Sequence, residues 1–284
     1  RHRIFAPILV VWPCLQSQLA MDTATMSTYT TWASAHFTCD KTGLTVRVKD
    51  AIVEETLSLL SEFMRSNIVK RKELRTAIGK VMHVASLIPT IRPFVSQMYG
   101  ALYAESSGPA GNTIWTKQVE HSLTWLISFL QESEVKLERR FDLATFHGRG
   151  QEVTICLDAS PWGLGGFLVE NRHIQSWFSC GISDEETDIL RISIAESAAQ
   201  QVVEALVVLV ALRAWKSRWI HQRVVLRVKS DNVSALVLCL RLKTDGHGTG
   251  LIAREMALDI SCSEYLPAIA EHIPGVDNVV ADPL

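Results

Sequence analysis

Acidic residues in the C-terminal half of the sequence occupy positions where metal chemistry is possible. Asp158 and Asp231 each end a short apolar run, and Glu204 opens the apolar stretch EALVVLVALRAW. Two acids at strand ends and one on a helix offer the oxygen ligands that Mg²⁺ prefers, while the ion keeps water in its shell for substrate phosphate oxygens. The pattern predicts a site for hard divalent cations. Asp282, near the end of the sequence, is a fourth candidate ligand.

Each of these residues also has an ordinary structural interpretation. A single Asp at a strand end usually bonds to nearby backbone in a turn, so only the joint arrangement favours a site. Glu196 competes with Glu204 for the helix position; Glu204 is favoured because apolar residues surround it. Asp282 precedes Pro283 in a terminal region, where residues commonly fray, and its support is its spacing from His272, itself an ordinary histidine when taken alone.

These acids need strands to position them. Short apolar runs bounded by turn-forming residues predict strands near 153–157, 166–169, 173–178, 224–228 and 268–273. The first three should form a meander. Asp158 is expected at the tip of the first strand, where Gly163, Gly165 and Gly166 would form a tight turn that leaves the acid uncovered. The tryptophans at 162, 177, 215 and 219 are interpreted as core or interface residues in preference to platforms on which bases stack.

Helical periodicity dominates the first half of the chain, and the pattern changes near residue 150. Apolar residues at helical spacing predict helices near 52–64, 74–85, 93–105, 115–132, 198–219, 233–240 and 251–261. Asp50 is expected to cap the first helix, and Pro89 to end the second. The sequence therefore predicts a mainly helical N-terminal part and an α/β C-terminal part.

Composition limits the class of protein. With 284 residues, 48% of them hydrophobic, the chain can bury a large core, and this length is more typical of two domains than of one. A formal net charge of −2 leaves nucleic-acid contacts to local basic patches such as 70–72 and 213–223. Six dispersed cysteines without a CxxC pair argue against a zinc site and a disulfide scaffold, so an intracellular location, cytoplasmic or nuclear, is expected.

The first residues allow two interpretations. Arg1–Arg3 followed by the apolar stretch 4–15 imitates a secretory signal peptide. The absence of an initial Met favours instead an internal piece of a longer chain. No apolar run is long enough to span a membrane, and no membrane partner is expected.

The stretches LDASPWGLGG, EALVVLVALRAW, KSDNVSAL and HIPGVDNVVADPL occur in this order. Together they resemble the ribonuclease H domain of retroelement reverse transcriptases, especially those of the tyrosine-recombinase and long-terminal-repeat types. His272 lies ten residues before Asp282, and Pro274, Gly275 and Asn278 also match the last motif, in which a mobile His precedes the final metal-binding Asp. The resemblance covers roughly 150–284 and implies a ribonuclease H-like mixed five-stranded sheet with flanking helices.

The helical half is similar to the same family. AIGKVMHVASLIP, followed by RPF, resembles the thumb that comes after the polymerase palm. The resemblance divides the chain into a palm tail at 1–48, a helical thumb or connection segment at 49–148, and a C-terminally truncated ribonuclease H-like domain at 149–284. The paired-aspartate motif of the polymerase is expected upstream of Arg1, since no YxDD-type motif occurs in the chain. No DNA polymerisation is expected from this piece alone.

The resemblance implies hydrolysis of the RNA strand of an RNA/DNA hybrid with two Mg²⁺ ions, for which Mn²⁺ is a substitute. Asp158 would bridge both ions, Glu204 and Asp231 would complete one side, and Asp282 the other. His272 would assist proton handling or product release. The implied partners are the hybrid and the upstream polymerase domain of the same polyprotein; the oligomeric state is left open.

Two other functions stay open from the sequence. The chain stops at Leu284, before the helix that usually supports the last motif, and 180–197 is a long lead into the first long helix. Both departures favour a catalytically inert remnant that at most binds nucleic acid. Nucleases and integrases of the same fold perform other phosphoryl transfers. The Glu on the first long helix favours ribonuclease H over integrase.

Overall fold

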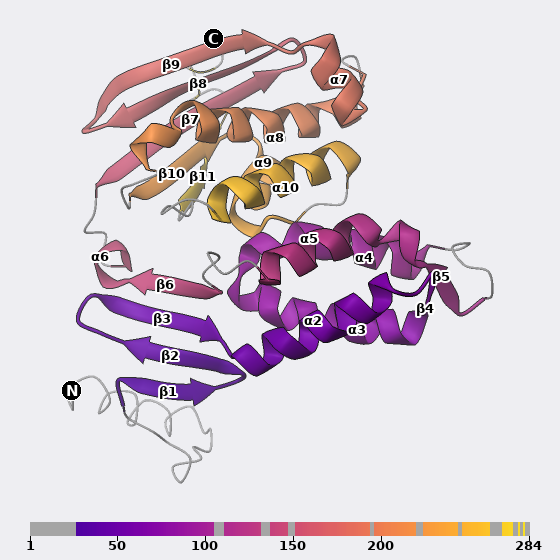
Figure 1. Ribbon diagram of the computed structural model, residues 1–284. Coiled ribbons are helices and arrows are strands. Elements are labelled where there is room, and N and C mark those ends of the chain that lie inside the picture. Colours follow the sequence, from indigo (N-terminus) through magenta and orange to yellow (C-terminus); the bar gives the residue numbers. More distant parts are fainter. Residues whose placement is uncertain are drawn as a thin grey trace, which may run out of the picture.

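The C-terminal half of the computed structural model is built on a mixed five-stranded sheet with helices packed against it (Figure 1). The structure describes residues 27–104, 111–131, 137–146, 151–193, 196–219, 224–243, 246–261, 269–274, 278 and 281. The strand order is β11-β10-β7-β8-β9. The strands are β7 (Glu152–Ser160), β8 (Gly163–Glu170), β9 (His173–Gly181), β10 (Val225–Ser230) and β11 (Ile269–His272). The α/β class and the three-stranded meander β7-β8-β9 are confirmed.

The glycines after Asp158 do not act as the sequence suggested. The turn between β7 and β8 is made by Pro161 and Trp162, whereas Gly165 and Gly166 lie within β8. A Cβ atom on Gly166 would come within 2.7 Å of Leu157 Cδ2. Glycine at position 166 is therefore required for close packing between strands, and the prediction that all three glycines form the turn was wrong.

Helices of the C-terminal half follow the predicted order with shifted ends. They are α7 (Asp184–Leu190), α8 (Ser197–Ala214), the 3₁₀ turn η4 (Lys216–Arg218), α9 (Val233–Arg241) and α10 (His247–Ser261). Most described side chains of α8 are buried, because the helix packs on β7 and also contacts α9 and α10. The helix ends at Ala214, not Trp219, since the chain tightens into η4. The segment leading into α8 contains α7, which begins with a capping box between Ser183 and Glu186.

The N-terminal half contains a group of packed helices, as predicted (Figure 1). They are α2 (Asp50–Met64), α3 (Arg71–Leu87), η2 (Pro89–Ile91), α4 (Arg92–Tyr103), η3 (Thr116–Gln118) and α5 (Glu120–Gln131). The second helix ends before Pro89, as expected. Asp50 is not the cap of α2: Lys49 occupies that position, and the Asp50 carboxylate accepts a hydrogen bond from Arg47 at 3.0 Å.

Strands also occur in the N-terminal half, and three of those described lie within 49–148, where a helical segment was expected. The antiparallel sheet β1-β2-β3-β6 consists of β1 (Tyr29–Trp32), β2 (Ala35–Cys39), β3 (Gly43–Val48) and β6 (Glu138–Asp142). A smaller pair joins β4 (Ile68–Lys70) to β5 (Thr113–Trp115), and the short helix α6 (Leu143–Phe146) follows β6. Because β6 pairs with β3, residues on both sides of the predicted boundary at 48 share one sheet. The three-part division itself stays a prediction.

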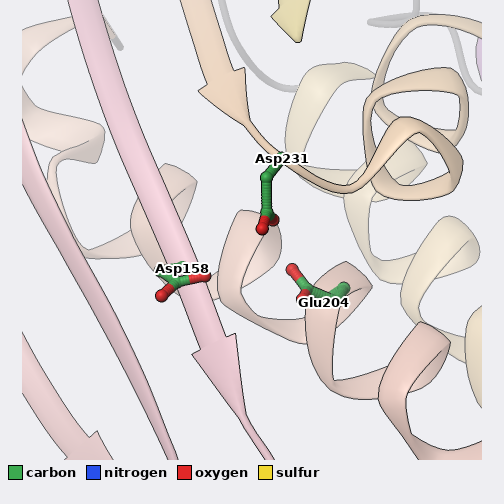
Figure 2. Close-up of side chains that lie close together, drawn as sticks. All are labelled: Asp158, Glu204 and Asp231. Atoms are coloured by element: carbon green, nitrogen blue, oxygen red, sulfur yellow. The ribbon is translucent and has the colours of Figure 1, made fainter. Parts of the chain in front are cut away.

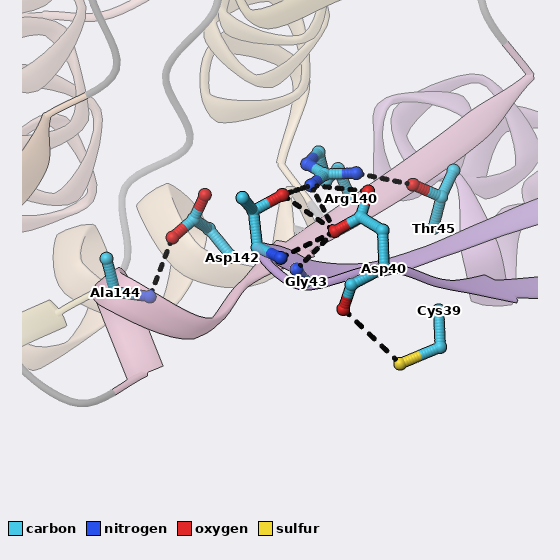
Figure 3. A network of polar contacts seen from close by, with 8 residues as sticks. Cys39, Asp40, Gly43, Thr45, Arg140, Asp142 and Ala144 are labelled. Atoms are coloured by element: carbon cyan, nitrogen blue, oxygen red, sulfur yellow. Dashed lines mark hydrogen bonds and ion pairs between the residues drawn. The ribbon is translucent and has the colours of Figure 1, made fainter. Parts of the chain in front are cut away.

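A polar network joins β6 to the turn between β2 and β3 (Figure 3). Asp40 accepts hydrogen bonds from the backbone N–H groups of Thr42 at 2.7 Å and Gly43 at 2.8 Å. Arg140 of β6 donates to both Asp40 oxygens at 3.1 Å and to Thr45 Oγ1 at 3.0 Å. Hydrogen bonds from Thr42, then from Gly43 and Arg140, hold the pKa of the Asp40 carboxyl well below its usual range. The network fixes the register at which β6 joins the sheet.

The two halves share one continuous hydrophobic cluster that includes Ile91 and Phe94 from the N-terminal half and Met256 from α10. Helix α10 packs against η2 and α4, and Arg92 Nη1 donates to the carbonyl oxygen of Arg241 at 3.4 Å. Among the helices described, none has the length and apolarity needed to cross a membrane.

Candidate metal site

Three carboxylates from separate elements converge at one edge of the five-stranded sheet (Figure 2). Asp158 lies on β7, Glu204 on α8, and Asp231 directly after β10. One oxygen from each side chain can be chosen so that all three atoms lie within 4.8 Å of one another. Strands β7 and β10 are parallel neighbours, so their carboxyl ends meet at the same edge, and α8 packs against β7. The group could hold a divalent cation.

Asp158 lies inside its strand and not at the tip. Strand β7 continues to Ser160, and Asp158 is paired in register with Gly165 of β8. The predicted strand-end position was therefore wrong by two residues. Because side chains alternate along a strand, Asp158 lies on the face opposite the buried Leu157 and Ala159. Gly165 has no side chain, and this leaves space beside the Asp158 carboxylate. Gly165 within β8, and not a glycine turn, therefore leaves the acid uncovered.

Glu204 is the buried member of the group, with 4% of its surface exposed. Its Oε1 accepts a hydrogen bond from Gln200 Nε2 at 2.9 Å, and the same nitrogen donates to the carbonyl oxygen of Ala159 at 2.9 Å. Gln200 thereby ties the carboxylate of α8 to strand β7. Glu204 Oε2 is buried without a hydrogen-bond partner among the described residues. A buried carboxylate oxygen without a partner is costly, and a bound cation would compensate it.

The electrostatic environment of Glu204 favours the binding of a cation at this site. Burial raises the pKa of Glu204 to about 7; the hydrogen bond from Gln200 opposes this rise, and the charges of Asp231 and Asp158 add to it. Repulsion from the two aspartates acts in the same direction as burial, which is the larger cause of the raised pKa.

The carboxylates open into a cavity of about 290 Å³. It is lined by Asp158, Ala159, Ser160, Gly163, Gly165, Gln200, Glu204, Asp231 and Ala281. Ala281, the residue directly before Asp282, lies in the cavity wall. Asp282 itself lies outside the described residues. Asn278 is buried and donates from Nδ2 to the Leu157 carbonyl oxygen at 3.3 Å, so this residue is anchored on β7 next to Asp158.

The two remaining described candidates, His272 and Glu196, are not members of the group of three acids. His272 ends β11, pairs in register with Ser230, and has an exposed side chain. Glu196 is exposed at the start of α8, so the structure brings Glu204, and not Glu196, to the two aspartates. Neither His272 nor Glu196 belongs to the metal-ligating group found among the described residues. The catalytic roles of all these residues stay predictions.

Sequence reasoning missed two features around the site. Gln200 lies four residues before Glu204, and this spacing, which places both on one helix face, could have identified it.

The tryptophans were all interpreted as core or interface residues. Trp215 and Trp219 are buried, but Trp162 and Trp177 are 72% and 64% exposed, so a core position is wrong for these two.

No protein-family model and no curated protein matches the chain. Among solved structures, foamy viral protease-reverse transcriptase in complex with an RNA/DNA hybrid has 12% identity and a TM-score of 0.33 over 89% of this chain. The same enzyme in complex with dsDNA has 13% identity and a TM-score of 0.31 over 75% of this chain. The chain spans 30% and 38% of the length of these structures. Similarity at this level carries no inference about function.

Proposed function

We propose that this chain is a metal-dependent endonuclease that hydrolyses the RNA strand of RNA/DNA hybrids, as part of a retroelement reverse transcriptase polyprotein. The convergence of Asp158, Glu204 and Asp231 on one cavity carries this proposal. The ordered motifs that resemble the ribonuclease H domain support the choice of reaction. Weak structural similarity to a viral reverse transcriptase adds nothing to it.

The residues present fit a divalent cation, because carboxylate oxygens are hard ligands and Glu204 Oε2 is buried without a described partner. Asp158, Glu204 and Asp231 would hold one Mg²⁺, or Mn²⁺ in its place, and Asp282 would help to hold a second. Bound divalent cations supply Lewis acidity toward phosphate oxygens and lower the pKa of water. Gln200 keeps Glu204 oriented toward β7 through its two hydrogen bonds.

The chain's own charges explain why a cation would be required. Three acids at one cavity repel the phosphodiester group when no cation neutralises them. His272, exposed at the end of β11, is proposed to assist proton handling or product release. Hybrids would be distinguished from DNA duplexes by 2′-hydroxyl groups and minor-groove shape, so little sequence preference is expected.

The test is cleavage of labelled RNA/DNA hybrid by the purified chain, with Mg²⁺, with Mn²⁺ and with EDTA. Asp158→Asn should lower the rate at least about 100-fold, because it removes a metal-binding charge. Asp188→Asn, the same change at an exposed position of α7, should leave the rate unchanged. Metal-dependent cleavage that survives Asp158→Asn would contradict the mechanism. Hybrid binding without any cleavage would favour the inert remnant.

A further inference from the structure

An exposed aromatic residue lies in a turn that is flanked by two residues of the acidic cavity. Trp162 lies in the turn between β7 and β8 and is 72% exposed. Ser160, two residues before it, and Gly163, directly after it, both line the cavity that contains the three carboxylates. The turn that carries the indole is therefore part of the rim of the candidate site.

The backbone that carries this indole is held from both sides. Ser160 Oγ accepts hydrogen bonds from the N–H groups of Trp162 at 3.2 Å and Gly163 at 3.1 Å. The carbonyl oxygen of Trp162 accepts a bond from the Ile182 N–H at 3.3 Å. Within the described part of the chain, no other aromatic ring stacks on Trp162. A fixed turn thus presents a free aromatic face to solvent, already ordered before any ligand arrives.

We propose that Trp162 is a stacking platform for a nucleobase of the nucleic-acid strand whose phosphate lies at the acidic cavity. This inference rests on the proposed function for the identity of the ligand. The cavity presents three acids to a polyanion, so affinity at this edge has to come from uncharged contacts as well as from cations. Stacking of a base on an aromatic side chain contributes about 1–3 kcal/mol and tolerates any base, which suits an enzyme with little sequence preference.

Trp177 provides a matched control within the same sheet. It is 64% exposed on the edge strand β9 and pairs in register with Phe167 of β8. Its chain neighbours Ser176 and Phe178 do not line the cavity. Both tryptophans are exposed and belong to the same meander. Only Trp162 is flanked by residues that line the cavity, so only Trp162 should contribute to binding.

The experiment measures binding of a short RNA/DNA hybrid in an Asp158→Asn background, which stops hydrolysis under the proposed mechanism. Trp162→Ala should weaken binding about 5- to 100-fold, and Trp162→Phe should restore part of it, since a smaller ring still stacks. Trp177→Ala should change the dissociation constant less than about twofold. Hybrid should quench tryptophan fluorescence, and the quenching should decrease in Trp162→Phe but persist in Trp177→Phe. In the chain with Asp158 intact, Trp162→Ala should raise KM with kcat nearly unchanged.

Unchanged affinity and quenching in Trp162→Ala would overturn the inference even if the parent chain cleaves hybrids. A change in oligomeric state on sedimentation, with affinity per chain unchanged, would overturn it too and assign the indole to a contact between copies. If the parent chain binds but does not cleave, and the affinity loss is still specific to Trp162, the stacking role stands while the proposed function fails.

Discussion

Glu204 is a buried carboxylate, and its burial makes the stability of the metal-free protein depend on pH. Its pKa of about 7 in the folded protein lies above the value of about 4.3 for an exposed Glu. The folded state therefore binds this proton more tightly than the unfolded state does. The stabilising contribution is complete below about pH 4 and is lost as pH rises through 7, a decrease of ~3–4 kcal/mol in the free energy of unfolding.

Glu204→Gln should remove this dependence. The amide stays neutral, and its oxygen can still accept the hydrogen bond from Gln200. In EDTA at pH 8, the variant should be ~3–4 kcal/mol more stable than the parent in urea unfolding, and the two should converge near pH 4. Equal stability of both proteins at pH 8 would show that Glu204 is not buried in its charged form.

At the residue scale, the sequence was sufficient to choose the acids but not their surroundings. Asp231 and Glu204 were chosen from their positions beside apolar runs, a local property. The position of Asp158 within β7 depends on its pairing with Gly165, and the exposure of Trp162 depends on how the turn projects. Neither follows from periodicity, because both are set by the neighbouring strand.

At the scale of one element, two glycines of α10 differ in what surrounds them. A Cβ atom on Gly248 would come within 2.7 Å of Val202 Cγ1 and 2.9 Å of the Leu190 carbonyl oxygen. A Cβ atom on Gly250 would have no neighbour within 4 Å. Gly248 therefore allows α10 to approach α8 and the end of α7 closely, whereas Gly250 only weakens the helix.

The same substitution should consequently have opposite effects at these two positions. Gly250→Ala should stabilise the protein by ~0.5–1 kcal/mol, because Ala has the higher helix propensity. Gly248→Ala should destabilise it by about 1–3 kcal/mol through overpacking. Thermal and urea unfolding of both variants would check this pair. A stabilising Gly248→Ala would mean that α10 does not pack closely on α8.

Elements with strong local apolar patterns were predicted well, whereas β6, which lacks such a pattern, was not. The helices α2, α3 and α9 and the meander β7-β8-β9 follow from local apolar patterns. Strand β6 was missed because its pairing partner β3 lies about 95 residues earlier, and its sequence ERRFD has little apolar alternation. Its place in the sheet depends on Arg140 and the Asp40 turn.

At the scale of the whole molecule, the change of pattern near residue 150 was visible in the sequence, but the packing between the halves was not. Helix α10 buries apolar residues and packs against α8 and α7 of its own half as well as against η2 and α4 of the other half. A sequence pattern identifies such residues as buried without naming the element that buries them. The single hydrophobic cluster across both halves is thus a property of the tertiary structure alone.

This shared core predicts that the C-terminal half depends on the N-terminal half for stability. Residues 149–284 produced alone should unfold at a lower urea concentration than the same part of the full chain, because the surface of α10 that contacts η2 and α4 becomes exposed. Within the full chain, Ile91→Ala should lower the free energy of unfolding by about 2–5 kcal/mol, since Ile91 is fully buried at the end of η2. Met82→Ala, a large-to-small change at an exposed position of α3, is the control and should cost much less. Unfolding followed by far-UV circular dichroism and by tryptophan fluorescence should give one coincident transition in the full chain. Two separate transitions, with the second unaffected by Ile91→Ala, would show that the halves fold independently and that the contact with α10 contributes little.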